Sequence, residues 1–397
     1  MNKRMKMNKT IVSIVKCKKI EDVHTRAIKE TVSESLHLIG GLETIICRGD
    51  TVLVKPNLVA PYPYESGAVT NPYVVKAICE LAKDAGARRV IIADGSAVGS
   101  RTEEAFSSSG LKVVAKEIGA GLIDLKRAEI LLVGIPNGLK IKRIRIPRVI
   151  MESNIIINVP VMKTHDVFPA TLGLKNMKGV LQENDKKRFH IWGLAQCIVD
   201  LNKLVLPSLT VLDGTIGMEG LGPTRGTPVN LGVIISSSDT VAVDTVAAAV
   251  MGINPEEIEY IKLASGQGLG CADLSQIEVR GRKIDEVRRP FKRVTLEASE
   301  YLKKGITIYE KGACSGCKHT IEHLVVNLER KGKLNLLKSY TIMFGQTVTP
   351  PIGYKGKLIK FGSCTKKYKG RDDYIPGCPP HPEDVLAFFE EKFSKSN

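Results

Sequence analysis

The chain has few aromatic residues and no long apolar run, and both shortages narrow what the protein can be. Only 5% of its 397 residues are aromatic, with a single Trp, so no aromatic stripe lies among the basic residues as a platform for stacking nucleic-acid bases. No run approaches the ~20 apolar residues of a membrane-spanning helix. The apolar run at residues 11–15, after the basic N-terminus, is too short for a signal-peptide core. We therefore expect a cytoplasmic protein that binds neither nucleic acid nor membrane.

Three glycine-containing motifs that are typical of enzymes are missing: the dinucleotide-binding fingerprint, the P-loop and the nucleophile elbow. Gly266, Gly268 and Gly270 are closely spaced, but they follow a predicted helix, whereas a dinucleotide fingerprint follows a strand. The sequence has no phosphate-binding P-loop and no Gly-x-Ser-x-Gly nucleophile elbow. These absences argue against a common dehydrogenase, kinase or esterase.

Basic residues outnumber acidic ones, and the excess is uneven along the chain. The 58 Lys and Arg against 42 Asp and Glu give a net charge of +16. From residue 301 onward there are 17 Lys and Arg and 9 Asp and Glu, so about half of the net charge lies in the last quarter. Such a field favours an acidic partner: nucleic acid, an acidic redox protein or a phosphorylated small molecule. A lysine-rich solvated surface without a partner is the alternative, and we favour it over nucleic-acid binding.

The first ~280 residues alternate short β-branched runs with helical patterns, which is typical of parallel α/β units. Six predicted strands are apolar on both faces, as central parallel strands are: residues 11–17, 51–54, 90–93, 155–159, 209–212 and 233–235. The predicted helices include residues 22–38, 73–85, 191–204, 241–251 and 256–264. We expect an α/β fold of mostly parallel sheets with flanking helices over residues 1–287, a linker at 288–300 and a small cysteine-containing region at 301–397.

Polar residues follow four of the predicted strands. Because open α/β sheets bind ligands beyond the carboxyl ends of their strands, these polar ends predict a shared ligand cleft. Its candidate residues are Lys55, Asn57, Asp94, Lys163, His165, Asp213 and Glu219. Lys163 also forms a cationic group with Lys175, Asn176 and Lys178 that could hold a phosphate or carboxylate.

Each cleft candidate also has a simpler interpretation. Asp94 and Asp213 precede glycine and could be turn residues, and the lysines could be solvated strand ends. His165 could be a surface histidine as readily as a base or a ligand. Asp239 is predicted as the N-cap of the helix that follows it, whereas Asp244 lies in the first turns of that helix and could face the cleft.

Four cysteines in the last quarter have the surroundings of metal ligands. Cys314 and Cys317 form a close pair, and Cys364 and Cys378 follow in loops that contain glycine or proline. Thiolates are soft ligands, and four of them suit an iron–sulfur cluster or a structural zinc. The alternative is four unrelated reduced thiols. The other five cysteines lie in apolar elements, which sets these four apart.

Several short motifs appear together in a specific order: Lys55-Pro-Asn57, Asp94-Gly-Ser, Lys163-Thr-His165, Gly173-Leu-Lys175-Asn176 and Ala-Val-Asp244. In these motifs the chain resembles the DUF362 family over residues 12–281. The resemblance implies an association with iron–sulfur modules and a distant relation to the N-terminal region of nickel-dependent lactate racemase. The chain lacks the closely spaced cysteine run of bacterial ferredoxins. Its Pro-Gly-Cys378-Pro-Pro segment is instead similar to a cluster-binding segment in small subunits of hydrogenases and quinone oxidoreductases.

Together these features predict an iron–sulfur protein, with [4Fe–4S] as the expected cluster, that relays electrons to or from an anionic ligand in the cleft. The cluster ligands would be Cys314, Cys317, Cys364 and Cys378, and the acid, base or metal-binding candidates are His165, Asp94 and Asp213. The ligand-binding candidates are Lys55, Asn57, Lys163, Lys175, Asn176, Glu219 and Asp244. One alternative is an isomerase or transferase that keeps zinc or a cluster as a structural metal. The other is a non-enzymatic electron carrier.

Overall fold

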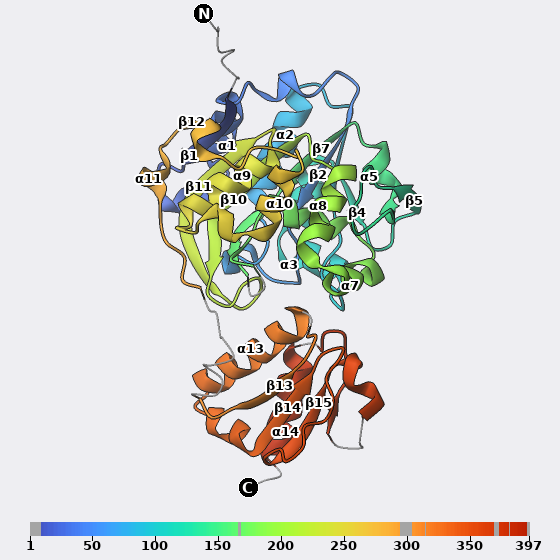
Figure 1. Ribbon diagram of the computed structural model, residues 1–397. Helices are drawn as coiled ribbons and strands as arrows, with labels where there is room; N and C mark the ends of the chain where they lie inside the picture. The colour runs from blue at the N-terminus through green and yellow to red at the C-terminus, as the bar shows by residue number, and fades with distance from the viewer. Residues whose placement is uncertain are drawn as a thin grey trace, which may run out of the picture. The chain divides into compact units, whose positions relative to one another are not determined.

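The computed structural model describes residues 9–165, 168–293, 304–313, 315–368, 373–380 and 382–394. The chain divides into two compact units, residues 1–293 and residues 294–397, and Figure 1 shows the first in colours from blue to orange and the second in colours from orange to red. Both units are α/β structures, which confirms the expected fold class. Within the described residues, no helix is both long enough and apolar enough to cross a lipid bilayer.

The first unit is built on one sheet of ten strands. Eight of them lie in the order β12-β1-β11-β10-β7-β2-β3-β4, and β8 and β9 branch from β10. The pairs from β10 to β4 are parallel, whereas β11 is antiparallel to both of its neighbours. The strands are β1 (Thr10–Lys16), β2 (Thr51–Pro56), β3 (Arg89–Asp94), β4 (Gly121–Asp124), β7 (Ile155–Val159), β8 (Val161–Thr164), β9 (Ala170–Thr171), β10 (Leu209–Glu219), β11 (Thr227–Ser237) and β12 (Ile277–Gly281); β5 (Ile130–Gly134) and β6 (Arg143–Pro147) form a separate hairpin.

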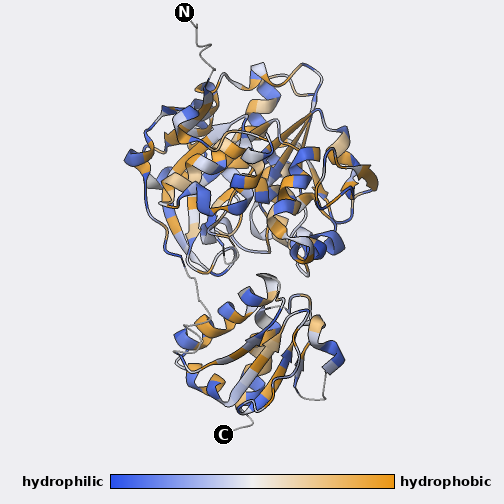
Figure 2. Cartoon of the chain, viewed as in Figure 1, coloured by the Kyte–Doolittle hydropathy of each residue, from blue (hydrophilic) through white to orange (hydrophobic). Residues whose placement is uncertain are grey.

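Helices cover both faces of this sheet, because alternate residues of its central strands enter two different apolar cores. In β2, Leu53 belongs to the core that includes α8 and α9, whereas Val52 and Val54 belong to the core that includes α1 and α2. The strands are accordingly coloured mainly as hydrophobic in Figure 2. The helices are α1 (Ile28–His37), α2 (Pro72–Asp84), α3 (Thr102–Ser108), α4 (Leu111–Ile118), α5 (Arg148–Glu152), α6 (Gly173–Asn176), α7 (Glu183–Trp192), α8 (Leu194–Leu204), α9 (Thr240–Val250), α10 (Glu259–Gly266) and α11 (Ile284–Val287).

Two helices of the first unit begin at capping residues that the sequence indicates. Asn71 Oδ1 accepts a hydrogen bond of 3.0 Å from Tyr73 N, with Pro72 as the first residue of α2. Asp239 Oδ1 accepts a hydrogen bond of 2.9 Å from Ala242 N at the start of α9. The predicted N-cap at Asp239 is therefore confirmed.

The predicted ends of several other helices and strands are wrong. The helix predicted over residues 191–204 is interrupted by Gly193, whose φ of +102° divides α7 from α8. The helix predicted over residues 22–38 is a 3-10 turn, Ile20–His24, followed by α1. The short strands predicted at residues 209–212 and 233–235 are parts of two strands of 11 residues, which form a long antiparallel pair.

The second unit contains a four-stranded parallel sheet that the sequence did not predict in detail. Its strands β13 (Thr307–Glu310), β14 (Tyr340–Phe344), β15 (Lys357–Phe361) and β16 (Tyr374–Ile375) pair in chain order. The helices α13 (Ser315–Arg330) and α14 (Pro382–Ser394) share one core with the sheet. Parallel strands place their carboxyl ends at one edge, so the loops after β13, β15 and β16 begin at the same edge.

Candidate functional site

A buried ion pair joins the ends of two neighbouring strands of the first unit. Lys55 Nζ lies 2.8 Å from Asp94 Oδ1, and the two side chains are 0% and 3% exposed. The topology brings them together, because β2 and β3 are adjacent and parallel and both residues lie near the carboxyl ends. Burial lowers the pKa of Lys55, and the charge of Asp94 opposes that shift. Asp94 Oδ2 also accepts a hydrogen bond of 2.7 Å from Leu58 N, which fixes the carboxylate in place.

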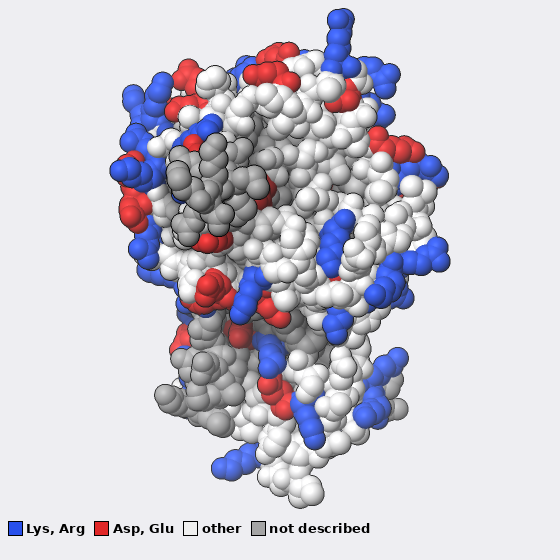
Figure 3. Space-filling view, turned by 45° about the horizontal axis from the view of Figure 1, so that its top comes forward, with Lys and Arg blue, Asp and Glu red and all other residues white. Residues whose placement is uncertain are grey.

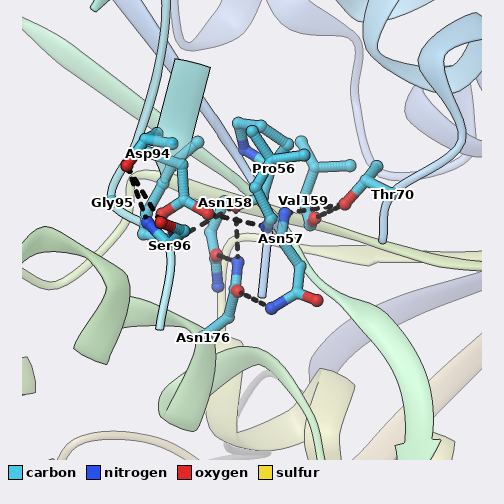
Figure 4. A network of polar contacts seen from close by, with 12 residues as sticks. Pro56, Asn57, Thr70, Asp94, Gly95, Ser96, Asn158, Val159 and Asn176 are labelled. Carbon is cyan, nitrogen blue, oxygen red and sulfur yellow. Dashed lines mark hydrogen bonds and ion pairs between the residues drawn. The ribbon is translucent and has the colours of Figure 1, made fainter. Parts of the chain in front are cut away.

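Near this pair, hydrogen bonds join the side-chain amides of Asn57, Asn176 and Asn158 in a row, as Figure 4 shows. Lys163 Nζ donates to Asn57 Oδ1 at 2.7 Å, and Asn57 Nδ2 donates to Asn176 Oδ1 at 2.9 Å. Asn176 Nδ2 then donates to Asn158 Oδ1 at 2.8 Å. These residues come from β8, the loop after β2, α6 and β7, so four separate segments are tied together. The structure therefore brings Lys55, Asn57, Asp94 and Lys163 together at the strand ends, and Asn176 of α6 joins them.

Lys163 is a buried lysine, and no carboxylate among the described residues lies in hydrogen-bond contact with it. Its Nζ donates to Asn57 Oδ1 and, at 2.8 Å, to Ala68 O, and both acceptors are neutral. Burial lowers the pKa of Lys163 well below its ordinary value, and the charges of Lys175 and Lys55 lower it further, whereas Asp94 opposes the shift. The site therefore holds an amine whose charged form is disfavoured by its surroundings.

Lys186 is a site residue that the sequence did not predict. It lies on α7, is only 5% exposed, and donates from Nζ to Gly95 O at 2.7 Å and Ser96 O at 2.8 Å. Burial lowers its pKa to about 7, with Asp94 opposing and Lys126 adding to the shift. A lysine in a run of charged residues is usually solvated, so the pattern around it gave no signal of burial. We call Lys55, Lys163 and Lys186 together with Asp94 the lysine cluster.

Two glycines bring main chain against the lysine cluster. A Cβ atom on Gly179 would lie 2.3 Å from Asp94 Oδ1 and 2.5 Å from Lys55 Nζ, and one on Gly95 would lie 2.8 Å from Gly179 O. No side chain fits at either position without movement of the pair or of the backbone. The glycines of the Asp94-Gly95 and Gly179 motifs are therefore explained by close packing around the cluster.

Asp213 and Asp244 act as anchors for backbone amides. Asp213 is 1% exposed and accepts hydrogen bonds from Asn71 N at 2.8 Å and from Thr215 N at 2.9 Å. Asp244 is fully buried and accepts from Gly173 N at 2.6 Å and from Leu174 N at 2.9 Å, at the start of α6. Burial raises the pKa of Asp213 to about 6 and that of Asp244 to about 8, against the lowering effect of these hydrogen bonds. Both carboxylates thus position segments that carry the site.

Glu219 lies at the end of β10 and holds the segment that leads out of the first unit. Arg289 donates to it with two nitrogens, at 2.7 and 3.2 Å, and Lys292 N donates at 2.9 Å. The Arg289 guanidinium lowers the pKa of Glu219. Its carboxylate is therefore engaged in a structural contact, which the sequence could not indicate because the partners are about 70 residues away.

His165 and Lys175 are half-buried. The His165 ring centroid lies 6.2 Å from that of Phe168, and Lys175 acts on Lys163 through its charge. The lysine cluster itself is closed. Beside it, a depression of about 310 Å³ is lined by Gly99, Ser100, Arg101, Thr102, Glu103, Asp124, Lys126, Arg127 and Glu183.

In the second unit, segments that carry three of the candidate cysteines meet beyond the sheet. A Cβ atom on Gly362, two residues before Cys364, would lie 3.3 Å from Cys317 Sγ and 3.6 Å from Gly377 O. Ser363 N donates to the same Gly377 O at 2.7 Å, which joins the segment of Cys364 to that of Cys378. Gly316 likewise packs on Pro379, since a Cβ atom there would lie 2.9 Å from the proline Cγ.

Cys314, the fourth predicted ligand, lies outside the described residues. Among the residues that the structure does describe, no group of three or more His, Cys, Asp or Glu side chains is arranged to hold a metal ion. The segments of the described cysteines nevertheless converge beyond the strand ends, because glycine allows them to approach closely. Cys317 lies in α13, and Cys364 lies in a 3-10 helix, Ser363–Tyr368, and not in the predicted loop.

Comparison with known proteins places residues 52–249 in the family described as a domain of unknown function, DUF362. The match confirms the resemblance that the strand-end motifs indicate. The thylakoid-associated protein sll1697 of Synechocystis sp. is 26% identical over 294 residues, which are 70% of this chain and 89% of that protein. The lactate racemase apoprotein of Thermoanaerobacterium thermosaccharolyticum is a similar solved structure, at 13% identity and a TM-score of 0.39. The match covers 64% of this chain and only 60% of the racemase chain.

Proposed function

We propose that this protein, whose residues 52–249 match the DUF362 family, has a redox function. That function would depend on an iron–sulfur cluster in the second unit. The cluster, which we expect to be [4Fe–4S], would be held by Cys314, Cys317, Cys364 and Cys378. It would exchange electrons with an anionic small molecule bound at the lysine cluster of the first unit. The protein would then be an iron–sulfur oxidoreductase.

The observation that carries this proposal is the meeting of the cysteine segments at one edge of a parallel sheet. Cys317 is 4% exposed, and a Cβ atom on Gly362 would lie 3.3 Å from its sulfur, 3.6 Å from Gly377 O and 3.7 Å from Pro380 Cδ. Thr320 Oγ1 donates to Pro380 O at 3.0 Å and so ties α13 to the segment of Cys378. Three segments that are distant in the sequence are thereby brought together, and the Thr320 hydrogen bond does not involve the thiols.

A bound cluster would supply one-electron chemistry, and the protein would supply its ligands and surroundings. Gly362 lies beside Cys317 Sγ, and hydrogen bonds from nearby main chain to the sulfurs are one means by which proteins set a cluster potential. Zinc would fit the same four thiolates. The similarity of the Pro-Gly-Cys378-Pro-Pro segment to cluster-binding segments favours iron–sulfur over zinc.

The test is anaerobic purification followed by iron, sulfide and zinc analysis and by visible spectroscopy. We expect a broad visible absorption band that dithionite bleaches, with iron and acid-labile sulfide in similar amounts. Cys378→Ser should lose most of the bound iron. The matched control is Cys47→Ser, because Cys47 is an exposed cysteine of the first unit. Zinc without sulfide would overturn the redox proposal, and unchanged iron in Cys378→Ser would remove Cys378 from the ligand set.

A second candidate function is isomerisation or group transfer at the lysine cluster, with the metal as a structural element. The pKa of Lys186, which burial lowers to about 7, favours it, because an amine that is partly neutral near physiological pH can accept protons. Burial lowers the pKa of Lys163 as well. This function requires no electron transfer. Activity that persists in a form of the protein with redox-inert zinc would support it over the first proposal.

We also propose an acidic redox protein as the macromolecular partner and the cytoplasm as the location. The basic excess after residue 301 supports the first, and the need for reduced thiols supports the second. On the face that Figure 3 shows, Lys and Arg are interspersed with Asp and Glu and form no continuous basic stripe of the kind that follows a nucleic-acid backbone. A non-enzymatic electron carrier would use the same partner without a small ligand.

A further inference from the structure

The hairpin of β5 and β6 presents to solvent a face that is both apolar and basic. In the register of the pair, Leu132 lies opposite Arg145 and Gly134 lies opposite Arg143, and residues directly opposite each other share one face of a sheet. Ile130 and Leu132 are 42% and 57% exposed, whereas the two isoleucines of β6, on the other face, are buried. The outer face of the hairpin therefore carries two exposed aliphatic side chains and two arginines.

One buried carboxylate joins this face to the end of α7. Arg145 donates from Nε and Nη2 to Asp185 at 3.0 and 3.1 Å, and Arg188 Nη1 donates to the same carboxylate at 3.3 Å. The Asp185 side chain is 7% exposed, whereas those of the two arginines are 37% and 51% exposed. The guanidinium carbon of Arg188 lies 5.8 Å from the centre of the Trp192 ring, and Trp192 is 41% exposed. We call six residues of the hairpin and α7 the arginine–tryptophan surface: Ile130, Leu132, Arg143, Arg145, Arg188 and Trp192.

Positive charge and exposed apolar side chains are both concentrated in the two segments that carry this surface. Residues 129–152 and 183–192 hold eight Lys and Arg against four Asp and Glu. They also hold six of the thirteen exposed large apolar side chains of the described structure: Ile130, Leu132, Leu139, Met151, Ile191 and Trp192. Apolar side chains that are scattered singly need no explanation. On the arginine–tryptophan surface they are grouped with arginines, which is typical of an interaction site.

We propose that the arginine–tryptophan surface docks a protein partner whose own surface is acidic around an apolar centre. Trp and Arg are among the side chains enriched where protein interfaces gain most of their binding energy. A guanidinium also fits the carboxylates of a partner through paired hydrogen bonds, the geometry that Arg145 already has with Asp185. The proposal goes beyond the redox function, because it requires neither a cluster nor the basic excess after residue 301.

The same features argue against other occupants of this surface. A second copy of the chain, docked symmetrically, would bring the arginines against the same arginines, and like charges oppose such a contact. The surface offers nucleic acid one aromatic side chain, Trp192, and not a stacking platform. Arg145 and Arg188 are held in place by Asp185, which favours a partner with fixed carboxylates over a fluid lipid surface.

The experiment uses Trp192 as the reporter of binding, because it is the only Trp of the chain. A library of random peptides displayed on phage is selected on the full-length, anaerobically purified protein. Enriched peptides that lack Trp are then synthesised and titrated while the emission of Trp192 is followed. We expect peptides that combine Asp and Glu with apolar residues to move this emission to shorter wavelength and to protect Trp192 from quenching by acrylamide.

Two double variants with the same changes test whether these peptides bind at the arginine–tryptophan surface. Leu132→Gln with Arg143→Gln removes two exposed side chains of the hairpin and should weaken binding of the acidic peptides by at least about tenfold. Leu274→Gln with Arg288→Gln changes an exposed pair of the same types beside β12. This control should bind the peptides within about twofold of the unaltered protein.

Several results would overturn the proposal. The first is that no enriched peptide changes the emission of Trp192, or that those which do carry no excess of Asp and Glu. The second is that the two double variants bind alike; if the hairpin variant does not fold, Arg143→Gln alone replaces it. The third is a stronger response of Trp192 to a single-stranded oligonucleotide, or to vesicles of phosphatidylglycerol and phosphatidylcholine, than to the peptides. The last is a dimer in sedimentation velocity that the hairpin variant dissociates, which would assign the surface to a second copy of the chain.

Discussion

The two units place their candidate chemistry at the same point of the fold, the carboxyl ends of parallel strands, but hold it in different ways. In the first unit, charged side chains are enclosed by the protein's own polar groups, such as Asn57 and Asn176 beside Lys163. In the second unit, main-chain contacts such as Ser363 N to Gly377 O hold the cysteine segments together. The first site is therefore held by side-chain contacts, whereas a cluster bound as proposed would add stability to the second.

Removing the metal should have the largest effect, and it should be confined to the second unit. Metal binding to cysteine-rich domains contributes on the order of 10 kcal/mol to folding. We expect ferricyanide and EDTA treatment to abolish the thermal transition of the second unit and to leave that of the first unit within about 2 °C of its starting value. Differential scanning calorimetry of the full chain, before and after treatment, measures both. Equal losses in the two thermal transitions would contradict the expectation that the metal stabilises the second unit alone.

Asp94→Asn should have the next largest effect, within the first unit. The substitution leaves Lys55 buried without its counter-charge, and breaking a buried pair in this way costs about 3–5 kcal/mol. Urea unfolding of the first unit measures the loss. The double variant Lys55→Met with Asp94→Asn should regain a large part of that stability, because no uncompensated charge remains. A double variant as unstable as Asp94→Asn alone would show that Asp94 acts through Leu58 N instead.

The unfolding free energy of the first unit should depend on pH in a way that shows the lowered pKa of the Lys186 amine. The folded pKa of Lys186 is about 7, below the ordinary value of 10.5, so the folded state binds fewer protons than the unfolded state between these pH values. Stability must then rise with pH in this window and be penalised below pH 7. From pH 7 to pH 9, we expect the unfolding free energy of the unaltered protein to rise by about 2 kcal/mol more than that of Lys186→Met. Lys187→Met should follow the unaltered protein, and parallel curves for all three would contradict a lowered pKa.

The sequence predicted those parts of the first unit that depend on local pattern. Apolar runs identified the strands, and the rule that ligands lie beyond strand ends brought Lys55, Asp94 and Lys163 into one hypothesis. The N-caps at Asn71 and Asp239 followed from residue type alone. Each of these signals lies within a few residues of the feature that it predicts.

The remaining features depend on contacts between distant segments, for which one sequence carries no signal. Burial of Lys186 results from the packing of α7 on the loop after β3, about 90 residues earlier. Asp244 could not be recognised as an anchor for Gly173 N without knowing that α6 and α9 meet. The second sheet was missed because its strands are short and its cysteines dominated the pattern of that region.

Glu219→Gln should have the smallest effect on stability. It tests whether the Glu219 carboxylate stabilises the fold through its contact with Arg289. Glu219 is 7% exposed and Arg289 is 41% exposed, so solvent screens the pair and about 1–2 kcal/mol should be lost. The Arg289 guanidinium lowers the pKa of Glu219, so its contribution is present above the ordinary value of 4.5 and is lost as pH falls through the folded pKa. The difference between the two proteins should therefore shrink below pH 4.5. Glu103→Gln, which removes the exposed pair with Arg127, should cost no more than about 0.5 kcal/mol.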